Sequence, residues 1–115
     1  MRKLWYGTAC CPPNLTRTIL SLGGYIYNTG RDEIYINQYI SNTANISLDS
    51  ANVNITMESE MPWNGNGSIT LSLEKSASFT VYLRIPSWAD KVVINGNVIE
   101  AAAVKNGYTA LNREW

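Results

Sequence analysis

The sequence predicts a mainly β fold: an antiparallel β-sandwich of about seven short strands with one short N-terminal helix. Beyond residue 24, apolar and polar residues alternate with a period of two, which is typical of half-buried strands. Turn-forming steps such as Asn95-Gly96 separate these segments at close spacing. A chain of 115 residues is large enough to bury one ordinary core, so we expect the strands to share it.

The helix is expected directly after the two adjacent prolines. Asn14 is a suitable N-cap, and Leu15, Ile19 and Leu22 recur at the spacing of one helix face. Gly23-Gly24 is a typical helix end. The pattern therefore predicts a short amphipathic helix with one apolar side.

Strand-like segments lie at residues 25–27, 33–40, 53–58, 69–74, 79–85, 91–95, 98–100 and 108–113. In the second of them, Ile34, Ile36 and Ile40 fall on one side and tyrosines and Asn37 on the other. The first two segments, the third and fourth, and the sixth and seventh are each expected to form a hairpin. The Asn-Gly step of the last hairpin favours a type I′ turn, and Pro86 ends the fifth segment.

Charge and hydropathy exclude two classes of partner. Lysine and arginine together number nine, as do aspartate and glutamate, so no net field attracts phosphates or an anionic surface. We therefore expect no nucleic-acid binding. The sequence also holds no apolar run near the roughly 20 residues of a membrane span, so no membrane partner is expected.

The two cysteines of the chain, Cys10 and Cys11, are neighbours, and the sequence has no histidine. A disulfide between adjacent cysteines would close a strained ring, so the pair indicates free thiols or metal ligands. One interpretation is two small residues half-buried in a turn. The other uses their place ahead of a helix N-terminus, whose partial positive charge favours the thiolate needed for attack or for metal ligation. Two thiolates make only half of a four-ligand zinc site.

Several motifs carry a family resemblance over nearly the whole chain. They are Cys-Cys-Pro-Pro-Asn-Leu-Thr-Arg from residue 10, Met-Pro-Trp-Asn-Gly from residue 61, and Leu-Arg-Ile-Pro-Ser-Trp-Ala from residue 83, followed by Val-Val-Ile-Asn-Gly-Asn and a final Gly-Tyr-Thr-Ala-Leu-Asn-Arg-Glu-Trp. In this order and spacing the chain resembles the C-terminal half of glycoside hydrolase family 127, the β-L-arabinofuranosidases.

The resemblance implies a retaining glycosidase with a cysteine thiolate on zinc. By motif match the nucleophile falls on Cys10, and both Cys10 and Cys11 are zinc ligands. The family's other zinc ligands, a glutamate and a further cysteine, and its glutamate acid/base belong to an (α/α)6 barrel upstream and are not part of this chain. Zinc is therefore the implied cofactor of the intact enzyme, absent from or weakly bound by these 115 residues.

The resemblance also implies a division of the chain. Residues 1–24 would be the last segment of the catalytic barrel, and residues 25–115 a β-sandwich domain truncated at its C-terminus. The piece alone is expected to be inactive, and its uncovered surfaces to allow self-association. The parent enzyme would act on an arabinose-containing plant glycan or glycoconjugate in a bacterium, in the cytoplasm or periplasm. The alternative is a non-catalytic sandwich that binds sugar or serves as a scaffold.

Other candidate residues have plainer interpretations. Glu58, Glu60 and Glu74 lie on polar strand faces, where we expect them to be solvated. Trp63 and Trp88 stand in corner-like contexts beside prolines, which favours anchoring a turn or closing the end of the sandwich. The alternative for both is a stacking platform for a sugar ring.

Overall fold

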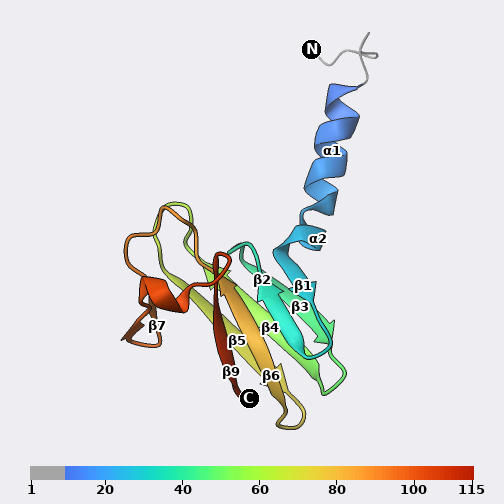
Figure 1. Cartoon of the computed structure of the whole chain (residues 1–115). Helices are drawn as coiled ribbons and strands as arrows, with labels where there is room; N and C mark the ends of the chain where they lie inside the picture. The colour runs from blue at the N-terminus through green and yellow to red at the C-terminus, as the bar shows by residue number, and fades with distance from the viewer. Residues whose placement is uncertain (1–9) are drawn as a thin grey trace.

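A computed structural model describes residues 10–115. The elements, in chain order, are α1 (Cys11–Ser21), α2 (Gly23–Ile26), β1 (Tyr27–Thr29), β2 (Glu33–Ile36), β3 (Asn42–Ser47), β4 (Asn52–Ser59), β5 (Gly67–Leu73), β6 (Ser78–Arg84), β7 (Val93–Ile94), β8 (Asn97–Val98), the 3₁₀ turn η1 (Ala101–Ala103) and β9 (Tyr108–Glu114) (Figure 1). The structure is therefore mainly β with one main helix, as the alternation of the sequence predicts.

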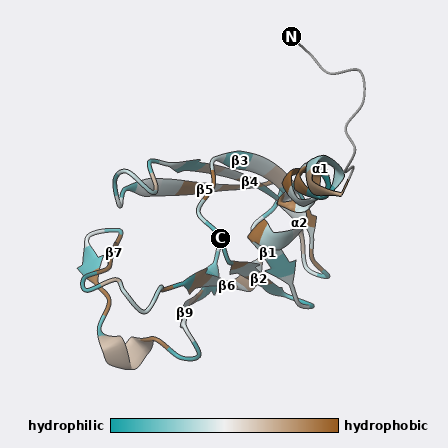
Figure 2. Ribbon diagram, turned by 90° about the horizontal axis from the view of Figure 1, so that it is seen from above, coloured by the Kyte–Doolittle hydropathy of each residue, from teal (hydrophilic) through white to brown (hydrophobic). Residues whose placement is uncertain are grey.

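Two sheets face each other in a sandwich-like arrangement (Figure 2). One has the strand order β1-β2-β6-β9 and the other β3-β4-β5, while β7 and β8 form a separate small hairpin. The pairings are antiparallel except between β2 and β6, which run parallel. This exception arises because the chain leaves β2 for the second sheet and returns to lie beside β2 only at β6.

The core lies between the two sheets and draws on both. Its buried side chains are Ile34, Ile36, Ile46, Val53, Ile55, Met57, Phe79, Val81 and Leu83. They come from alternate positions of β2, β4 and β6, with Ile46 from β3, because every second residue of a strand points to the same face. At about 1.5–3 kcal/mol for each fully buried large side chain, this cluster is the main source of stability.

The hairpins whose turns are strongest in sequence form as expected. β4 pairs with β5 from Val53↔Leu73 to Ser59↔Gly67, and β7 pairs with β8 across Asn95-Gly96. Both turn residues have positive φ, 49° at Asn95 and 83° at Gly96, as a type I′ turn requires.

Several expected strand boundaries are wrong, and one strand was missed. Residues 25–27 were expected to be a strand, but α2 occupies residues 23–26 and β1 begins at Tyr27. The expected strand 33–40 stops at Ile36, and Ile40 is 43% exposed, because residues 37–41 cross to the other sheet. Strand β3 was not expected at all. Its sequence Asn-Thr-Ala-Asn-Ile-Ser has little β propensity and one buried residue, so pairing with β4 decides its conformation.

Helix α1 begins earlier than expected and projects from the sandwich (Figure 1). Cys10 rather than Asn14 is the N-cap, and the prolines lie in the first turn, where their fixed φ suits a helix and their missing N–H groups would have no partner. The radius of gyration of 17.9 Å exceeds the roughly 13 Å of a compact domain of this size. None of the described helices is long and apolar enough to cross a membrane.

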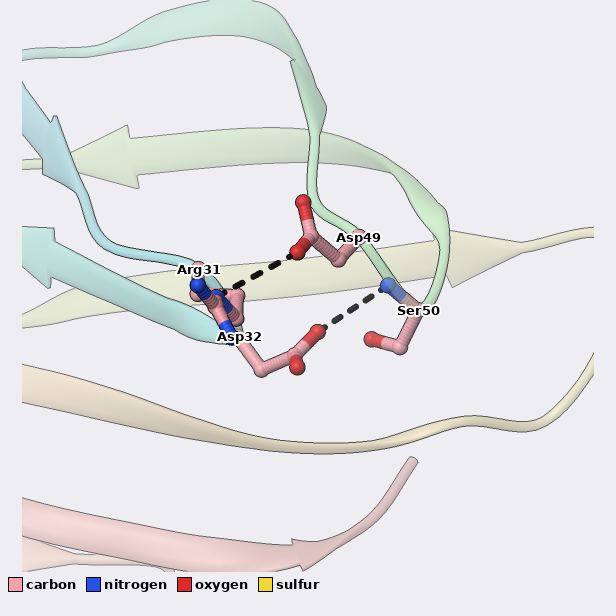
Figure 3. A network of polar contacts seen from close by, with 4 residues as sticks. All are labelled: Arg31, Asp32, Asp49 and Ser50. Atoms are coloured by element: carbon pink, nitrogen blue, oxygen red, sulfur yellow. Dashed lines mark hydrogen bonds and ion pairs between the residues drawn. The ribbon is translucent and has the colours of Figure 1, made fainter.

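Opposite ends of the sandwich differ in their loops. The chain enters β1 and leaves β2, β4 and β6 at the end from which α1 projects, as the strand registers and Figure 1 show. At the other end, Asp49 pairs with Arg31 at 3.6 Å, and the Ser50 amide donates to Asp32 Oδ1 at 3.0 Å (Figure 3). These contacts connect the turn before β2 with the turn after β3. We call the two ends the α1 end and the charged end.

Candidate functional site

The cysteine pair lies at the start of α1, at the tip of the projecting helix. Cys10 stands at the N-cap position of α1, without a capping hydrogen bond from its side chain, and Cys11 is the first residue of the helix. Both side chains are exposed and unoxidised. The dipole of α1 places a partial positive charge at this end of the helix, but Pro12 and Pro13 supply no N–H groups in the first turn. The interpretation of the pair as half-buried turn residues is therefore not supported by the structure.

The two sulfur atoms lie 3.7 Å apart. This is far longer than the roughly 2.05 Å of a disulfide. Two thiolates held about 2.3 Å from one zinc ion at a tetrahedral angle lie roughly 3.8 Å from each other. The spacing of the thiols thus fits a shared tetrahedral ion, and the donor type suits zinc.

Polar residues continue the face of α1 on which Cys10 lies. Asn14 and Arg17 follow Cys10 at helical spacing, and Arg17 Nη1 donates to Asn14 Oδ1 at 3.2 Å. The Asn14 amide donates to the Cys10 carbonyl at 3.2 Å, which is the first bond of the helix. Arg17 therefore places its charge on the same side of α1 as the Cys10 thiol.

The described residues supply only this half of a metal site. Among residues 10–115, no group of three or more histidine, cysteine, aspartate or glutamate side chains could hold a metal ion. Glu58, Glu60 and Glu74 are exposed on the sandwich, and Glu60 accepts a hydrogen bond from Asn66 at 3.3 Å. A complete zinc site or a paired acid/base would need residues from outside this segment.

The apolar face of α1 has no cover in the described structure. Leu15 is 63% exposed and Ile19 57%, and no residue of α1 is buried. A helix this short is marginal without tertiary packing of its apolar face.

Trp63 and Trp88 do not have the anchoring role that the sequence favours. Trp63 is 93% exposed and Trp88 75% exposed, so neither closes the end of the sandwich. Trp88 follows Pro86 in a turn closed by a hydrogen bond from the Ala89 amide to the Pro86 carbonyl. Their proline contexts predict the turns correctly, but a local context does not determine what a turn side chain packs against.

A cluster of tyrosines on the outer face of the four-stranded sheet was not singled out from the sequence. Tyr35 and Tyr82, paired across β2 and β6, stack with ring centroids 4.4 Å apart. Both hydroxyls donate to the Glu33 carboxylate, at 3.0 Å and 3.5 Å, and the first of these bonds raises the pKa of Tyr35. Tyr108 packs edge-on against Tyr35. The alternation of Glu33 and Tyr35 was visible in sequence, but their meeting with Tyr82 depends on the parallel pair.

Comparison with known proteins agrees with this structure. Residues 33–115 match the model of the "Beta-L-arabinofuranosidase, GH127 middle domain". A curated relative, a non-reducing end β-L-arabinofuranosidase of Bifidobacterium longum subsp. longum, is 38% identical over 90 residues, which are 74% of this chain and 13% of that protein.

Solved structures show the same relation over the full chain. A GH127 β-L-arabinofuranosidase from Geobacillus stearothermophilus T6 is similar over 100% of this chain and 19% of its own, with a TM-score of 0.84 and 37% identity. The GH127 β-arabinofuranosidase BT3674 is similar over 99% of this chain and 21% of its own, with a TM-score of 0.81 and 35% identity. The chain thus spans about a fifth of the length of these relatives.

The fold and the matches together define the class of this protein. The chain is a segment of a glycoside hydrolase, and the segment includes a β-sandwich. Within that class, the chain belongs to the GH127 β-L-arabinofuranosidase family, and residues 33–115 correspond to the family's middle domain. The expected division at residue 24 stays a prediction, since the match begins at residue 33 and no boundary is measured.

Proposed function

We propose that this chain is the part of a retaining β-L-arabinofuranosidase-like enzyme that supplies its cysteine nucleophile and two of its zinc ligands. The carrying observation is the 3.7 Å separation of Cys10 Sγ and Cys11 Sγ at the exposed start of α1. Membership of the GH127 family supports a carbohydrate as substrate. The names of the three relatives described above support an arabinofuranoside.

In this proposal, Cys10 and Cys11 hold zinc together with ligands from outside the chain. When bound, zinc keeps thiols deprotonated at neutral pH. Arg17, on the same helix face, adds a full positive charge on that side of α1.

The Cys10 thiolate would attack the anomeric carbon of the sugar. A bond between Cys10 Sγ and the anomeric carbon forms as the glycosidic carbon–oxygen bond breaks, and the departing alcohol takes a proton from an acid outside this chain. Water, deprotonated by the same group, then displaces the sulfur. Two displacements at one carbon return the original configuration, which is why the enzyme would be retaining.

Among residues 10–115, no aspartate or glutamate joins the two thiols in a cluster of three metal-binding side chains. Glu58, Glu60 and Glu74 lie exposed on the sandwich. The 115-residue chain alone should therefore show no turnover of an aryl β-L-arabinofuranoside, even with added zinc. Turnover at the rate of an ordinary enzyme would contradict the proposal that the acid/base lies outside this chain.

Kinetics of the parent enzyme test the proposal directly. Cys10→Ser should abolish hydrolysis of the aryl substrate, while Thr16→Val, on the same helix, should leave the rate close to wild type. Circular dichroism of each variant would show that the fold is kept. A Cys10→Ser enzyme that is folded and keeps its kcat would rule out Cys10 as the nucleophile.

A further inference from the structure

We propose that the outer face of the four-stranded sheet is a carbohydrate-binding surface, formed by Tyr35, Tyr82 and Tyr108 around the small residue Ala110. Its ligand is a neutral oligosaccharide that contains arabinose. We call these four residues the tyrosine face. The proposal takes only the choice of arabinose from the proposed function, and it concerns the sandwich rather than the thiols of α1.

Strand alternation and register bring the tyrosine face together. Every second residue of β2, β6 and β9 points away from the core, and Tyr35, Tyr82, Tyr108 and Ala110 are among these outward residues. Strands β2 and β9 flank β6, so Tyr35 adjoins one side of Tyr82 and Ala110 the other. The tyrosines are half-buried and Ala110 is exposed. A sugar ring can therefore lie over Ala110 against the side of Tyr82 that Tyr35 does not cover.

The three tyrosine rings are held in fixed positions. Tyr35 and Tyr82 stack with 4° between their ring planes, and the Tyr108 ring centroid lies 5.6 Å from that of Tyr35, edge-on. All three hydroxyls are hydrogen-bonded, two to the Glu33 carboxylate and that of Tyr108 to Asn37 Oδ1 at 2.7 Å. Tyrosine gives a large contact area at little conformational entropy, and a pre-ordered surface loses less on binding.

The direction of these hydrogen bonds selects the ligand. Each tyrosine hydroxyl has one proton, and all three protons are donated to Glu33 or Asn37, so the hydroxyl oxygens can only accept from a ligand. The Glu33 carboxylate also only accepts, and it keeps about two of its four lone-pair sites free. The ligand must therefore bring several donors, as the hydroxyls of a sugar do. Phosphate brings acceptors and negative charge, which Glu33 repels.

The composition of this surface favours a sugar over a protein partner. Within residues 10–115, none of the exposed large hydrophobic side chains belongs to β1, β2, β6 or β9. The cores of protein interfaces are depleted in charged residues, whereas Glu33 and the exposed Arg84 lie beside the tyrosines on this face. Small-molecule sites combine aromatic side chains with a few placed polar groups. Membership of a glycoside hydrolase family supports a sugar as that molecule.

Titration of the 115-residue chain with an arabinose trisaccharide, followed by two-dimensional amide NMR, tests the proposal. The amide signals of Tyr82 and Ala110 should shift as the sugar is added. Ala110→Leu fills the space beside Tyr82 and should weaken binding at least about tenfold. Thr70→Leu places the same side chain at an exposed position of β5 and should bind as wild type does. Equal binding by Ala110→Leu and wild type would overturn the proposal.

Glu33→Gln tests the role of the acceptors independently. An amide nitrogen replaces one carboxylate oxygen, so binding of the trisaccharide should weaken although the side chain keeps its shape. If the spectrum of Ala110→Leu shows an unfolded chain, Glu33→Gln decides the question. A folded Glu33→Gln chain with unchanged affinity would contradict the proposal.

The parent enzyme gives a second measurement. Ala110→Leu should reduce retention of the enzyme on insoluble arabinan, whereas Thr70→Leu should be retained as wild type is. Equal retention of both variants would contradict the proposal.

Three other outcomes would assign the tyrosine face to something else and overturn the proposal. Shifts of the Tyr82 and Ala110 signals with inorganic phosphate would mean an anion site. Shifts that follow protein concentration without sugar would mean a second copy of the chain. Loss of sugar binding in Cys10→Ser would place the sugar at the thiols. Because none of these measurements uses turnover, failure here is distinguishable from failure of the catalytic role of Cys10.

Discussion

Cys10 Sγ and Cys11 Sγ lie 3.7 Å apart at the first turn of α1. That distance suits two ligands of one tetrahedral zinc ion and is too long for a bond between the sulfurs. The prolines at positions 12 and 13 lie in the first turn directly after Cys10 and Cys11, so both thiols stand at the helix start. Sequence order, helix start and sulfur spacing thus agree on one interpretation.

Zinc binding by the isolated chain is the first expected result. Two thiolates should bind zinc weakly, and either Cys10→Ser or Cys11→Ser should remove most of the heat measured in a calorimetric titration. Thr16→Val is the matched control on the same helix and should bind as wild type does. If the titration shows no binding of zinc to the wild-type chain, the result would favour the alternative of a scaffold without a metal site.

Ile55 tests the origin of the stability of the sandwich. Its side chain is fully buried in the core between the sheets, so Ile55→Ala should lower the free energy of unfolding by about 2–5 kcal/mol. Thr56→Ala, at the exposed neighbouring position, should lower the free energy of unfolding by about 1 kcal/mol or less. Denaturant titrations measure both. Equal losses in the free energy of unfolding for the two variants would contradict the assignment of Ile55 to the core.

Tyr39 predicts an alkaline limit to stability. Burial raises its pKa to about 12 from the usual 10.0, although the Arg84 guanidinium opposes the shift. The unfolded chain therefore ionises first, so this contribution is complete below pH 10.0 and is lost as pH rises toward about 12.

The matched variant for this pH dependence is Tyr39→Phe. It removes the hydrogen bond from the Tyr39 hydroxyl to the Arg84 carbonyl, 2.8 Å long, and should cost about 0.5–1.5 kcal/mol at neutral pH. It should also make the alkaline decline shallower, with the rest due to groups such as Tyr27, whose pKa burial also raises. Identical slopes for wild type and variant in alkaline denaturation would refute this role.

The isolated chain is expected to self-associate weakly. Leu15 and Ile19 are exposed on α1 and gain by any contact that excludes water. Light scattering should show a mean mass that grows with concentration, and the double variant Leu15→Ser/Ile19→Ser should reduce the growth. A mean mass that stays at the value of the monomer at high concentration would contradict self-association.

Much of the fold could be predicted where the signal is local. Strands β4 and β6 carry strict alternation, and their inward residues, such as Val53 and Val81, are the buried ones. The Asn95-Gly96 turn followed from its dipeptide alone. Each of these features depends on residues within a few positions of one another.

Features set by distant contacts could not be predicted in this way. Strand β3 is polar apart from Ile46, and only its pairing with β4 makes it a strand. The parallel pairing of β2 with β6 joins segments separated by three other strands, and no local pattern encodes it. The start of α1 was placed too late because Asn14, directly after the two prolines, is itself a suitable N-cap, whereas the prolines lie in the first turn.

The same distinction between local and distant signals applies to the candidate site. The position of Cys10 and Cys11 at the start of a helix could be predicted from the prolines and the apolar spacing that follow them, while their role as zinc ligands stays a prediction. The exposure of Trp63 and Trp88 could not be predicted, because the neighbouring prolines determine the turn but not what the side chain packs against.

The most direct measurement of the catalytic role is to locate the sugar on the enzyme during turnover. Parent enzyme quenched in acid while hydrolysing an aryl β-L-arabinofuranoside would be digested, and its peptides analysed by mass spectrometry. The account predicts one pentosyl group on the sulfur of Cys10, and none in the Cys10→Ser enzyme. A pentosyl group on a carboxylate, with Cys10 unmodified, would contradict it.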